Sequence, residues 1–369
     1  MFILLNRSSN HQKISNILSF FANLPKGEDP GSYATQRPMV QFYPDNQQKH
    51  LFQNIPQPPN SYKVIQTQEY NHNSRFGDHK NKDNYENVLK SKLKLSKNYS
   101  TTSSPMTGNV SYSVHVFYYA WYANPKIDGN WLHWNHEYMP NWNNQDTRIY
   151  PTGVHDADND DIGANFYPQL GCYSSADDDV ISNHMYQIRQ AGIGVLVLSW
   201  YPPSTSDEHG KPVDRLLPKL LDAADKLNLK IALHVEPYKN RSAETFRTCL
   251  EYVVKTYASH RAFYKVKLPG RREPLPLYYI YDSYHTSPDE WARLFSPTGD
   301  LSVRNTNLDG IFLSLLVEFK HRADVKNGAF DGFYTYFAAN GFSHGSSWKN
   351  WRSLNMFSKV RKKVALVDS

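Results

Sequence analysis

The most restrictive feature of the sequence is a regular alternation of short apolar runs with helical patterns, which begins at Ser113 and continues to Val367. The apolar runs are continuous and rich in β-branched and aromatic residues, as in residues 194–199 and 229–234. Strands of this kind are buried on both faces, which is typical of a parallel sheet covered by helices. The sequence therefore predicts an α/β fold.

The order of these elements narrows the fold further. Strands are predicted at residues 114–119, 194–199, 229–234, 276–281, 309–317, 332–336 and 364–367, and helices at 179–191, 213–227, 243–257, 288–295, 319–327 and 346–359. So regular an order favours a (β/α)8 TIM-type barrel over an open doubly wound sheet, and no glycine-rich phosphate loop follows the first strand. An eighth strand is missing, so we expect a barrel that is incomplete at the C-terminus, with six to seven βα units and two unpaired sheet edges.

The N-terminal part of the chain differs in composition. Residues 1–110 are rich in Asn, Gln, Ser, Lys and Pro and show no sustained period, which predicts a disordered or flexible stem before a barrel domain at 111–369. The apolar start at residues 1–5 is too short for a signal sequence, and polar residues interrupt the run at 14–24. Neither segment is a convincing membrane anchor.

Charge and cysteine content exclude several kinds of partner. The net charge is +6, but the basic residues gather in segments that look like a solvated linker and a helix end, without an arginine-rich stripe. We therefore predict no nucleic-acid partner, and nothing in the sequence indicates a protein partner. Cys172 and Cys249 are the two cysteines, which we expect to be unpaired, and they form no CxxC pair for a metal.

In a barrel, active-site groups lie just beyond the C-terminal ends of the strands. These positions are crowded with aromatic rings, imidazoles and carboxylates, which is typical of a carbohydrate site because rings stack on sugars and polar groups hold hydroxyls. The candidates for substrate binding are Tyr119, Trp121, Tyr122, His133 and Trp134 after the first strand, Trp200 and Tyr201 after the second, His234, Glu236 and Tyr238 after the third, Asp282 and Tyr284 after the fourth, Glu318 after the fifth, and Tyr336, Asn340 and His344 after the sixth.

Each candidate has an alternative interpretation. Any single aromatic ring is as compatible with the core as with a site, and Glu236 and Asp282 could serve only to orient loops, although a charge at an apolar strand end is more often functional. His133 and His136 have the spacing of metal ligands but lack a third ligand nearby, so we expect no metal and no cofactor. Glu236 and Glu318 could form the acid/base pair of an unrelated hydrolase, which their separation would decide.

Several strings together resemble one family. They are HVFYYAWYANP (115–125), HWNHE (133–137), DDIGANFYPQLGCYSS (160–175), HMYQIRQAGIGVLVLSWYPP (184–203), HVEPYKNR (234–241), YYIYDSYHTSP (278–288) and DGFYTYFAANGFSHGSS (331–347). This stretch, residues 115–357, resembles glycoside hydrolase family 99, the endo-α-1,2-mannosidases. The resemblance implies a (β/α)8 fold and an enzyme that cuts an internal α-1,2-mannosidic bond in N-glycan processing, releases glucosylated mannose, and in animals resides in the Golgi membrane.

The resemblance also implies roles for particular residues. Trp200 and Tyr201 should lie beside the sugar on the non-reducing side of the cut, with a tyrosine at Tyr201 associated with accepting glucose. His234, Glu236, Tyr238, Tyr122 and the segment Tyr281, Asp282, Ser283 and Tyr284 should line the cleft.

The chain departs from the family in one respect. The family keeps two catalytic carboxylates in a Glu-Trp-His-Glu string after the eighth strand, and this string does not occur here. Loss of a general acid alone costs about 10²–10⁴-fold in rate. We therefore expect no catalytic residue among these residues and no turnover by the chain alone; the alternative is a non-catalytic glycan-binding protein.

Overall fold

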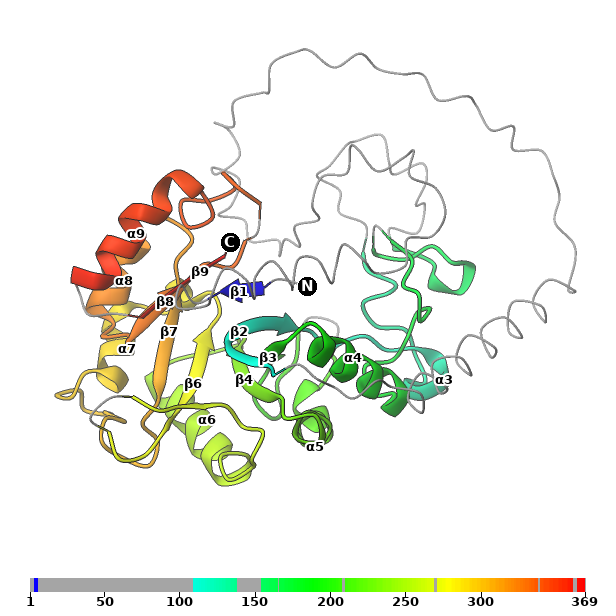
Figure 1. Cartoon of the computed structure of the whole chain (residues 1–369), viewed down its shortest axis with the longest axis horizontal. Helices are drawn as coiled ribbons and strands as arrows, with labels where there is room; N and C mark the ends of the chain where they lie inside the picture. Colours follow the sequence, from blue (N-terminus) through cyan, green and yellow to red (C-terminus); the bar gives the residue numbers. More distant parts are fainter. Residues whose placement is uncertain are drawn as a thin grey trace, which may run out of the picture. The chain divides into compact units, whose positions relative to one another are not determined.

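The computed structural model describes residues 3–5, 109–137, 154–164, 166–207, 210–268, 271–337, 339–360 and 364–368. Seven strands in this part of the chain pair in parallel, each with the next (Figure 1). They are β2 (Ser111–Tyr118), β3 (Ile193–Trp200), β4 (Lys230–Val235), β6 (Leu275–Ile280), β7 (Ile311–Leu315), β8 (Gly332–Tyr334) and β9 (Val364–Asp368). The predicted TIM-type barrel, one parallel strand short, is confirmed.

The place of the eighth parallel strand is taken by β1 (Ile3–Leu5), which runs antiparallel between β2 and β9. Leu4 lies opposite His115 of β2 and Asp368 of β9. The expectation of two unpaired sheet edges is therefore wrong, because a three-residue apolar run carries no period that would reveal a strand. Except for these three residues and 109–110, the predicted stem lies outside the described residues.

Helices cover the outside of the ring (Figure 1). The main ones are α4 (Asp178–Gln190), α5 (Leu217–Lys226), α6 (Ala243–Thr256), α7 (Pro288–Phe295), α8 (His321–Asn327) and α9 (Trp348–Val360), and α3 (Pro125–Asp128) is a single turn. The helix predicted at 213–227 is divided into the 3-10 helix η4 (Val213–Leu216) and α5. Pro218 explains the division, because proline lacks the N–H that a continuous helix would need there and suits the first turn of a new one.

Two layers of core follow from the alternation of side chains along each strand. In β3, Val195 and Val197 belong to the inner cluster, which also holds Tyr279 and Tyr334. The residues between them, such as Leu196, belong to the larger outer cluster against the helices. Most of these side chains are buried, so the ring encloses a packed core and places its chemistry at the strand ends.

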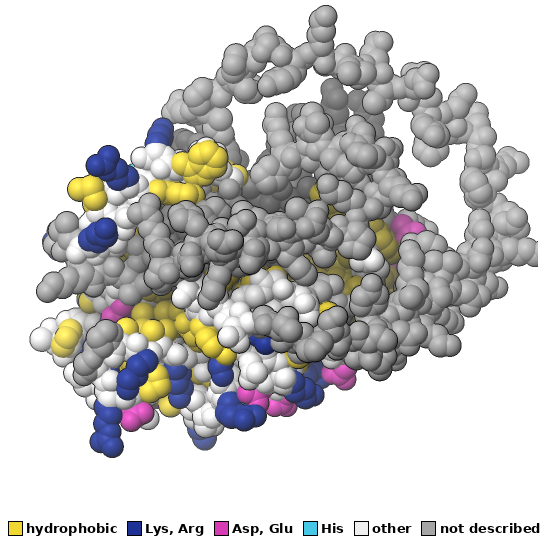
Figure 2. All heavy atoms as spheres, in the orientation of Figure 1, with side chains coloured by type: hydrophobic (Ala, Val, Ile, Leu, Met, Phe, Trp, Pro, Cys, Tyr) yellow, Lys and Arg dark blue, Asp and Glu magenta, His cyan; other side chains and the backbone are white. Residues whose placement is uncertain are grey.

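The shorter elements were not predicted. They are η3 (Ala157–Asn159), η5 (Ser283–His285) and β5 (Lys265–Val266), which pairs antiparallel with β6. None of the helices within the described ranges is long and apolar enough to cross a membrane. On the face drawn in Figure 2, Lys and Arg side chains are interspersed with Asp and Glu.

Candidate active site

A hydrogen-bonded network joins the C-terminal ends of three strands. Nδ1 of His234 lies 3.1 Å from Oε1 of Glu236, and Nε2 lies 2.8 Å from the hydroxyl of Tyr334. Because a carboxylate accepts hydrogen bonds, the imidazole donates from Nδ1 to Glu236, and its Nε2 is left to the hydroxyl of Tyr334. The hydroxyl of Ser199 also donates to Oε1 of Glu236, at 2.7 Å. All four side chains are buried, so the network fixes the carboxylate in one orientation.

Aromatic rings surround His234. The ring of Tyr336 stacks on it with centroids 5.6 Å apart, and the rings of Tyr281 and Phe117 each lie 4.8 Å from it. The sequence predicted that His234, Glu236, Tyr281 and Tyr336 share one site, and the structure brings them together.

Asp282 adds a second carboxyl group beside this network. Its backbone is left-handed, with φ of 44°, and its Oδ1 accepts a 2.6 Å hydrogen bond from Tyr284. Burial raises the pKa of Asp282; the hydrogen bond from Tyr284 opposes this shift, and the charge of Glu236 adds to it. A carboxyl group in this environment keeps its proton at a higher pH than an exposed one.

Arg241 holds the backbone that carries Asp282. Its guanidinium donates to the carbonyl oxygens of Tyr281 at 2.8 Å and Asp282 at 2.6 Å, and it lies 5.5 Å from the ring centroid of Trp291. The left-handed conformation is uncommon for a residue other than glycine, so these two bonds stabilise a turn that local preference does not favour.

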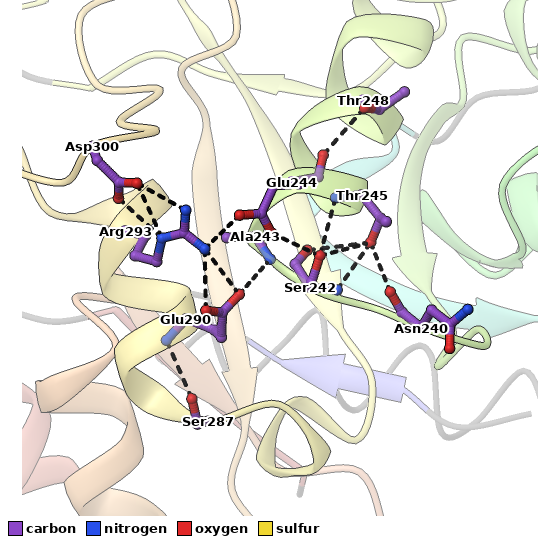
Figure 3. Close-up of polar contacts among 10 residues, drawn as sticks. All are labelled: Asn240, Ser242, Ala243, Glu244, Thr245, Thr248, Ser287, Glu290, Arg293 and Asp300. Atoms are coloured by element: carbon purple, nitrogen blue, oxygen red, sulfur yellow. Dashed lines mark hydrogen bonds and ion pairs between the residues drawn. The ribbon is translucent and has the colours of Figure 1, made fainter.

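Figure 3 shows how the loop between β4 and α6 is fixed. Ser242 caps α6 by accepting from the backbone N–H of Thr245, and the Thr245 hydroxyl accepts from the Ser242 N–H at 2.9 Å. The same hydroxyl donates to the carbonyl of Asn240 at 3.1 Å. Glu290 of α7 accepts from the N–H of Ala243 at 3.0 Å. This capping box ends the loop at a defined point.

Arg293 extends these contacts across the surface. It pairs with Glu244 at 2.6 Å, Glu290 at 3.2 Å and Asp300 at 2.8 Å, as Figure 3 shows. The loop that carries Tyr238 is therefore bounded by contacts between α6 and α7. Tyr238 itself is partly buried, 3.4 Å from the Thr245 hydroxyl, and burial raises its pKa.

The candidates that follow β2 form a group of stacked aromatic rings. Tyr119 stacks on Trp121, and Trp121 on His133, each with centroids 4.5 Å apart, while Tyr122 stacks on Trp134 at 4.2 Å. His133 is buried, and its Nε2 lies 2.7 Å from Oδ2 of the buried Asp207.

Trp200 and Tyr201 occupy the end of β3. Trp200 is fully buried and donates its indole N–H to Asp214 at 2.9 Å, while Tyr201 is 5% exposed. The hydroxyls of Tyr252 and Tyr257 donate to the same carboxylate, at 2.7 and 2.9 Å. The Trp200 ring therefore lies in the core, where its hydrogen bond to Asp214 fixes the end of β3.

The remaining candidates lie on the loops after β7 and β8. Glu318 is partly buried, which raises its pKa, and its charge raises the pKa of Tyr284. Asn340 accepts from the N–H of Trp348 at 3.0 Å, and Nδ1 of His344 accepts from Asn350 at 3.0 Å. The charge of Glu236 raises the pKa of Asp282. The pairing of Glu236 with Glu318 as the acid and base of an unrelated hydrolase stays a hypothesis.

Residues 109–368 match the model of glycosyl hydrolase family 99. The chain belongs to this family. Similar proteins include two named glycoprotein endo-alpha-1,2-mannosidase, from Xenopus laevis (51% identical, covering 67% of this chain and 55% of that protein) and Rattus norvegicus (50%, 67% and 53%). A glycoprotein endo-alpha-1,2-mannosidase-like protein from Homo sapiens is 48% identical, covering 66% of this chain and 53% of that protein. The chain thus spans about half the length of these curated relatives.

A solved structure supports the assignment of the fold. The structure of the GH99 endo-alpha-mannosidase from Bacteroides thetaiotaomicron is 40% identical, with a TM-score of 0.58, and covers 68% of this chain and 69% of that one. The family resemblance predicted from the sequence is therefore confirmed.

Several residues of this family 99 chain were missed by the sequence reasoning. Ser199 is a polar residue inside an apolar strand, and Tyr334 precedes Tyr336 at the two-residue spacing of one strand face, so each left a weak signal. Arg241 and Asp214 left none, since each looks like an ordinary surface charge until its partners are known.

A metal site or a cavity elsewhere in the protein would be another place for a ligand. Within the described ranges, no group of three or more His, Cys, Asp or Glu side chains is placed to hold a metal ion. A cavity of about 510 Å³ lies elsewhere, near Tyr112, Lys230 and Tyr264, close to the N-terminal ends of β2 and β4. Active sites of barrels of this kind lie at the opposite end, so the cavity is separate from the family 99 site.

Proposed function

We propose that this chain carries the mannose-binding part of an endo-acting α-1,2-mannosidase, with a mannose-containing N-glycan as its substrate. The observation that supports the proposal most is the buried network of His234, Glu236 and Tyr334 among aromatic rings at the strand ends. It occurs in a chain about 50% identical to proteins named glycoprotein endo-alpha-1,2-mannosidase.

One carboxylate oxygen of Glu236 is available to a ligand. Both hydrogen bonds to Glu236 from the described residues fall on Oε1, so Oε2 can accept from a sugar hydroxyl. Tyr281, Asp282 and Tyr284 follow the neighbouring strand and supply further ring and hydroxyl contacts. The chemistry of apolar ring faces beside fixed polar groups suits a pyranose.

We further propose that these residues bind the glycan without cleaving it, because they contain no Glu-Trp-His-Glu string. The second candidate function is a non-catalytic glycan-binding protein. The two are separated by the coding sequence downstream of Ser369: a Glu-Trp-His-Glu string there favours the enzyme, and a stop in independent transcripts favours the binder.

Calorimetric titration of the purified chain with α-1,2-mannobiose tests the binding proposal. We expect saturable binding, no release of product, and about tenfold weaker binding by Glu236→Gln, since hydrogen bonds to charged groups contribute about 1.5–3 kcal/mol. Glu251→Gln, on a more exposed part of α6, is the matched control and should leave the affinity unchanged. Failure to bind mannobiose, or equal binding of cellobiose, would contradict the proposal.

By the same family resemblance, we propose N-glycan processing in the Golgi membrane as the setting. Fluorescence microscopy of the tagged chain, with Golgi and cytosolic markers, tests this. A diffuse signal outside the Golgi would count against it.

A further inference from the structure

We infer that Phe319 and Trp348 form an outer glycan-contact surface beside the candidate site. The inference rests on the proposed function, because it concerns how a longer oligosaccharide than mannobiose is held. Phe319 follows β7, and Trp348 begins the helix that follows β8. These strands are parallel neighbours of the ring, so both residues lie at the same end of the barrel as Glu236 and Asp282.

Both side chains are among the most exposed aromatic side chains of the described residues, at 61% for Phe319 and 65% for Trp348, with Phe166 also at 61%. The rings of Trp200, Trp291 and Phe312 are, by contrast, essentially buried. In the orientation shared by Figures 1 and 2, exposed hydrophobic side chains appear where α9 lies. An aromatic ring at the mouth of a carbohydrate site that keeps an exposed face is available for stacking.

Contacts with neighbours hold Phe319 in place. The guanidinium of Arg322 lies 3.7 Å above its ring centroid, and the imidazole of His344 lies edge-on to it at 5.3 Å. Arg322 covers one face, and the ring is nevertheless mostly exposed, so the opposite face is open. A ring already oriented in this way loses little conformational freedom when a sugar stacks on it.

Trp348 is tied to the same loop. Its backbone N–H donates to Oδ1 of Asn340, and its ring lies 6.5 Å from that of Trp351, whose indole N–H donates to Gly345 at 3.2 Å. His344, which contacts Phe319, belongs to this loop as well. The two rings are thus carried on one connected structure.

The surroundings favour a glycan over a protein partner. Exposed polar side chains accompany the two rings, namely Lys320 beside Phe319, Lys349 beside Trp348, and Asn340. A stable protein interface needs about 800 Å² from each partner with an apolar centre, which two rings among charged groups do not supply. Pyranose units match this mixture, since they present apolar ring faces and hydroxyl edges to the solvent.

Isothermal titration calorimetry of the full chain with α-1,2-mannobiose and with α-1,2-linked mannotetraose tests the inference. We expect the tetraose to bind more tightly than the biose. Phe319→Ala and Trp348→Ala should each weaken tetraose binding by about two- to tenfold, the scale of one aromatic contact, and leave mannobiose binding unchanged.

Met356→Ala is the matched control. Met356 is 58% exposed on the same helix as Trp348, about 12 Å further along it, so its loss removes exposed apolar surface away from the mouth. It should affect neither oligosaccharide. Unchanged thermal unfolding of all three variants shows that they are folded, and Phe319→Leu and Trp348→Leu replace any alanine variant that is not.

The outcomes separate this inference from the proposed function. If mannobiose binds but the tetraose binds no more tightly, the outer surface alone is overturned. The same holds if the tighter binding of the tetraose persists in both alanine variants. Absence of binding by either oligosaccharide overturns the proposed function and the outer surface with it. A gain that disappears equally in Met356→Ala indicates a non-specific effect of apolar surface and also overturns the inference.

Discussion

The indole N–H of Trp200 donates a 2.9 Å hydrogen bond to Oδ1 of Asp214, which joins the end of β3 to the 3-10 helix η4. The hydroxyls of Tyr252 and Tyr257 converge on the same carboxylate. A single acidic side chain therefore fixes the strand end from which Tyr201 follows.

The role of this carboxylate can be tested by Asp214→Asn. We expect the free energy of unfolding to fall by about 1–3 kcal/mol, because an amide oxygen replaces a charged group that receives three donors. Urea unfolding followed by circular dichroism measures the change. Asp222→Asn, which alters the more exposed partner of His260, is the control and should change stability by less than about 0.5 kcal/mol. Equal effects of the two substitutions would show that the convergence on Asp214 adds nothing.

Tyr334→Phe tests the network at the barrel mouth. The substitution removes the hydroxyl that is hydrogen-bonded to Nε2 of His234 and leaves this buried nitrogen without its partner. We expect the melting temperature to fall by about 2–6 °C, which corresponds to about 1–2 kcal/mol. Tyr264→Phe removes a hydroxyl that donates to the Tyr112 carbonyl at a more exposed position, and should have a smaller effect. A larger loss in Tyr264→Phe would contradict the importance of the network.

Stability should decrease in acid because of His115. Burial lowers the pKa of His115 from 6.5 to about 4, so between these values the unfolded chain binds a proton that the folded chain does not. Stability is therefore lost as pH falls from about 6.5 to 4, by up to about 3 kcal/mol for this residue. Urea unfolding at several pH values measures the slope.

His115→Gln should flatten that slope without abolishing it, since burial also lowers the pKa of His184 and His321 to about 4. An unchanged slope in His115→Gln would mean that the imidazole does not resist protonation in the folded state.

Gly194→Ala tests the approach of β3 to β2. A Cβ atom at this position would lie 2.5 Å from the carbonyl oxygen of Ser111 and 2.7 Å from the nitrogen of Tyr112, which are backbone atoms that cannot rotate away. We expect a loss of about 1–3 kcal/mol in the free energy of unfolding, as for other overpacked cores. Thermal unfolding that matches the wild type would show that the strands can separate at no cost.

The strands were the most predictable part of the fold. Their continuous apolar runs placed β3 and β4 within one or two residues of the observed bounds, and the same runs indicated the parallel barrel. Strand ends in a barrel converge, so His234, Glu236 and Tyr281 could be assigned to one site before any coordinates were known.

Other features could not be predicted, because they depend on contacts between distant segments. Nothing near Arg241 in the sequence shows that its guanidinium will be buried against the backbone of Asp282. Nothing near Trp200 identifies Asp214 as its partner. The apolar run of β1 is too short to predict a strand. Its pairing with β2 and β9 depends on how the whole ring closes.

The position of β1 has a consequence for how the protein is made. Its Leu4 pairs with Asp368 of β9, so one seam of the ring joins segments from opposite ends of the described chain. Contacts between such distant segments carry a large entropic cost of loop closure and slow the search for the native arrangement. This seam can therefore form only after β9 has been synthesised and has left the ribosome, so it closes later than the pairing of β2 with β3.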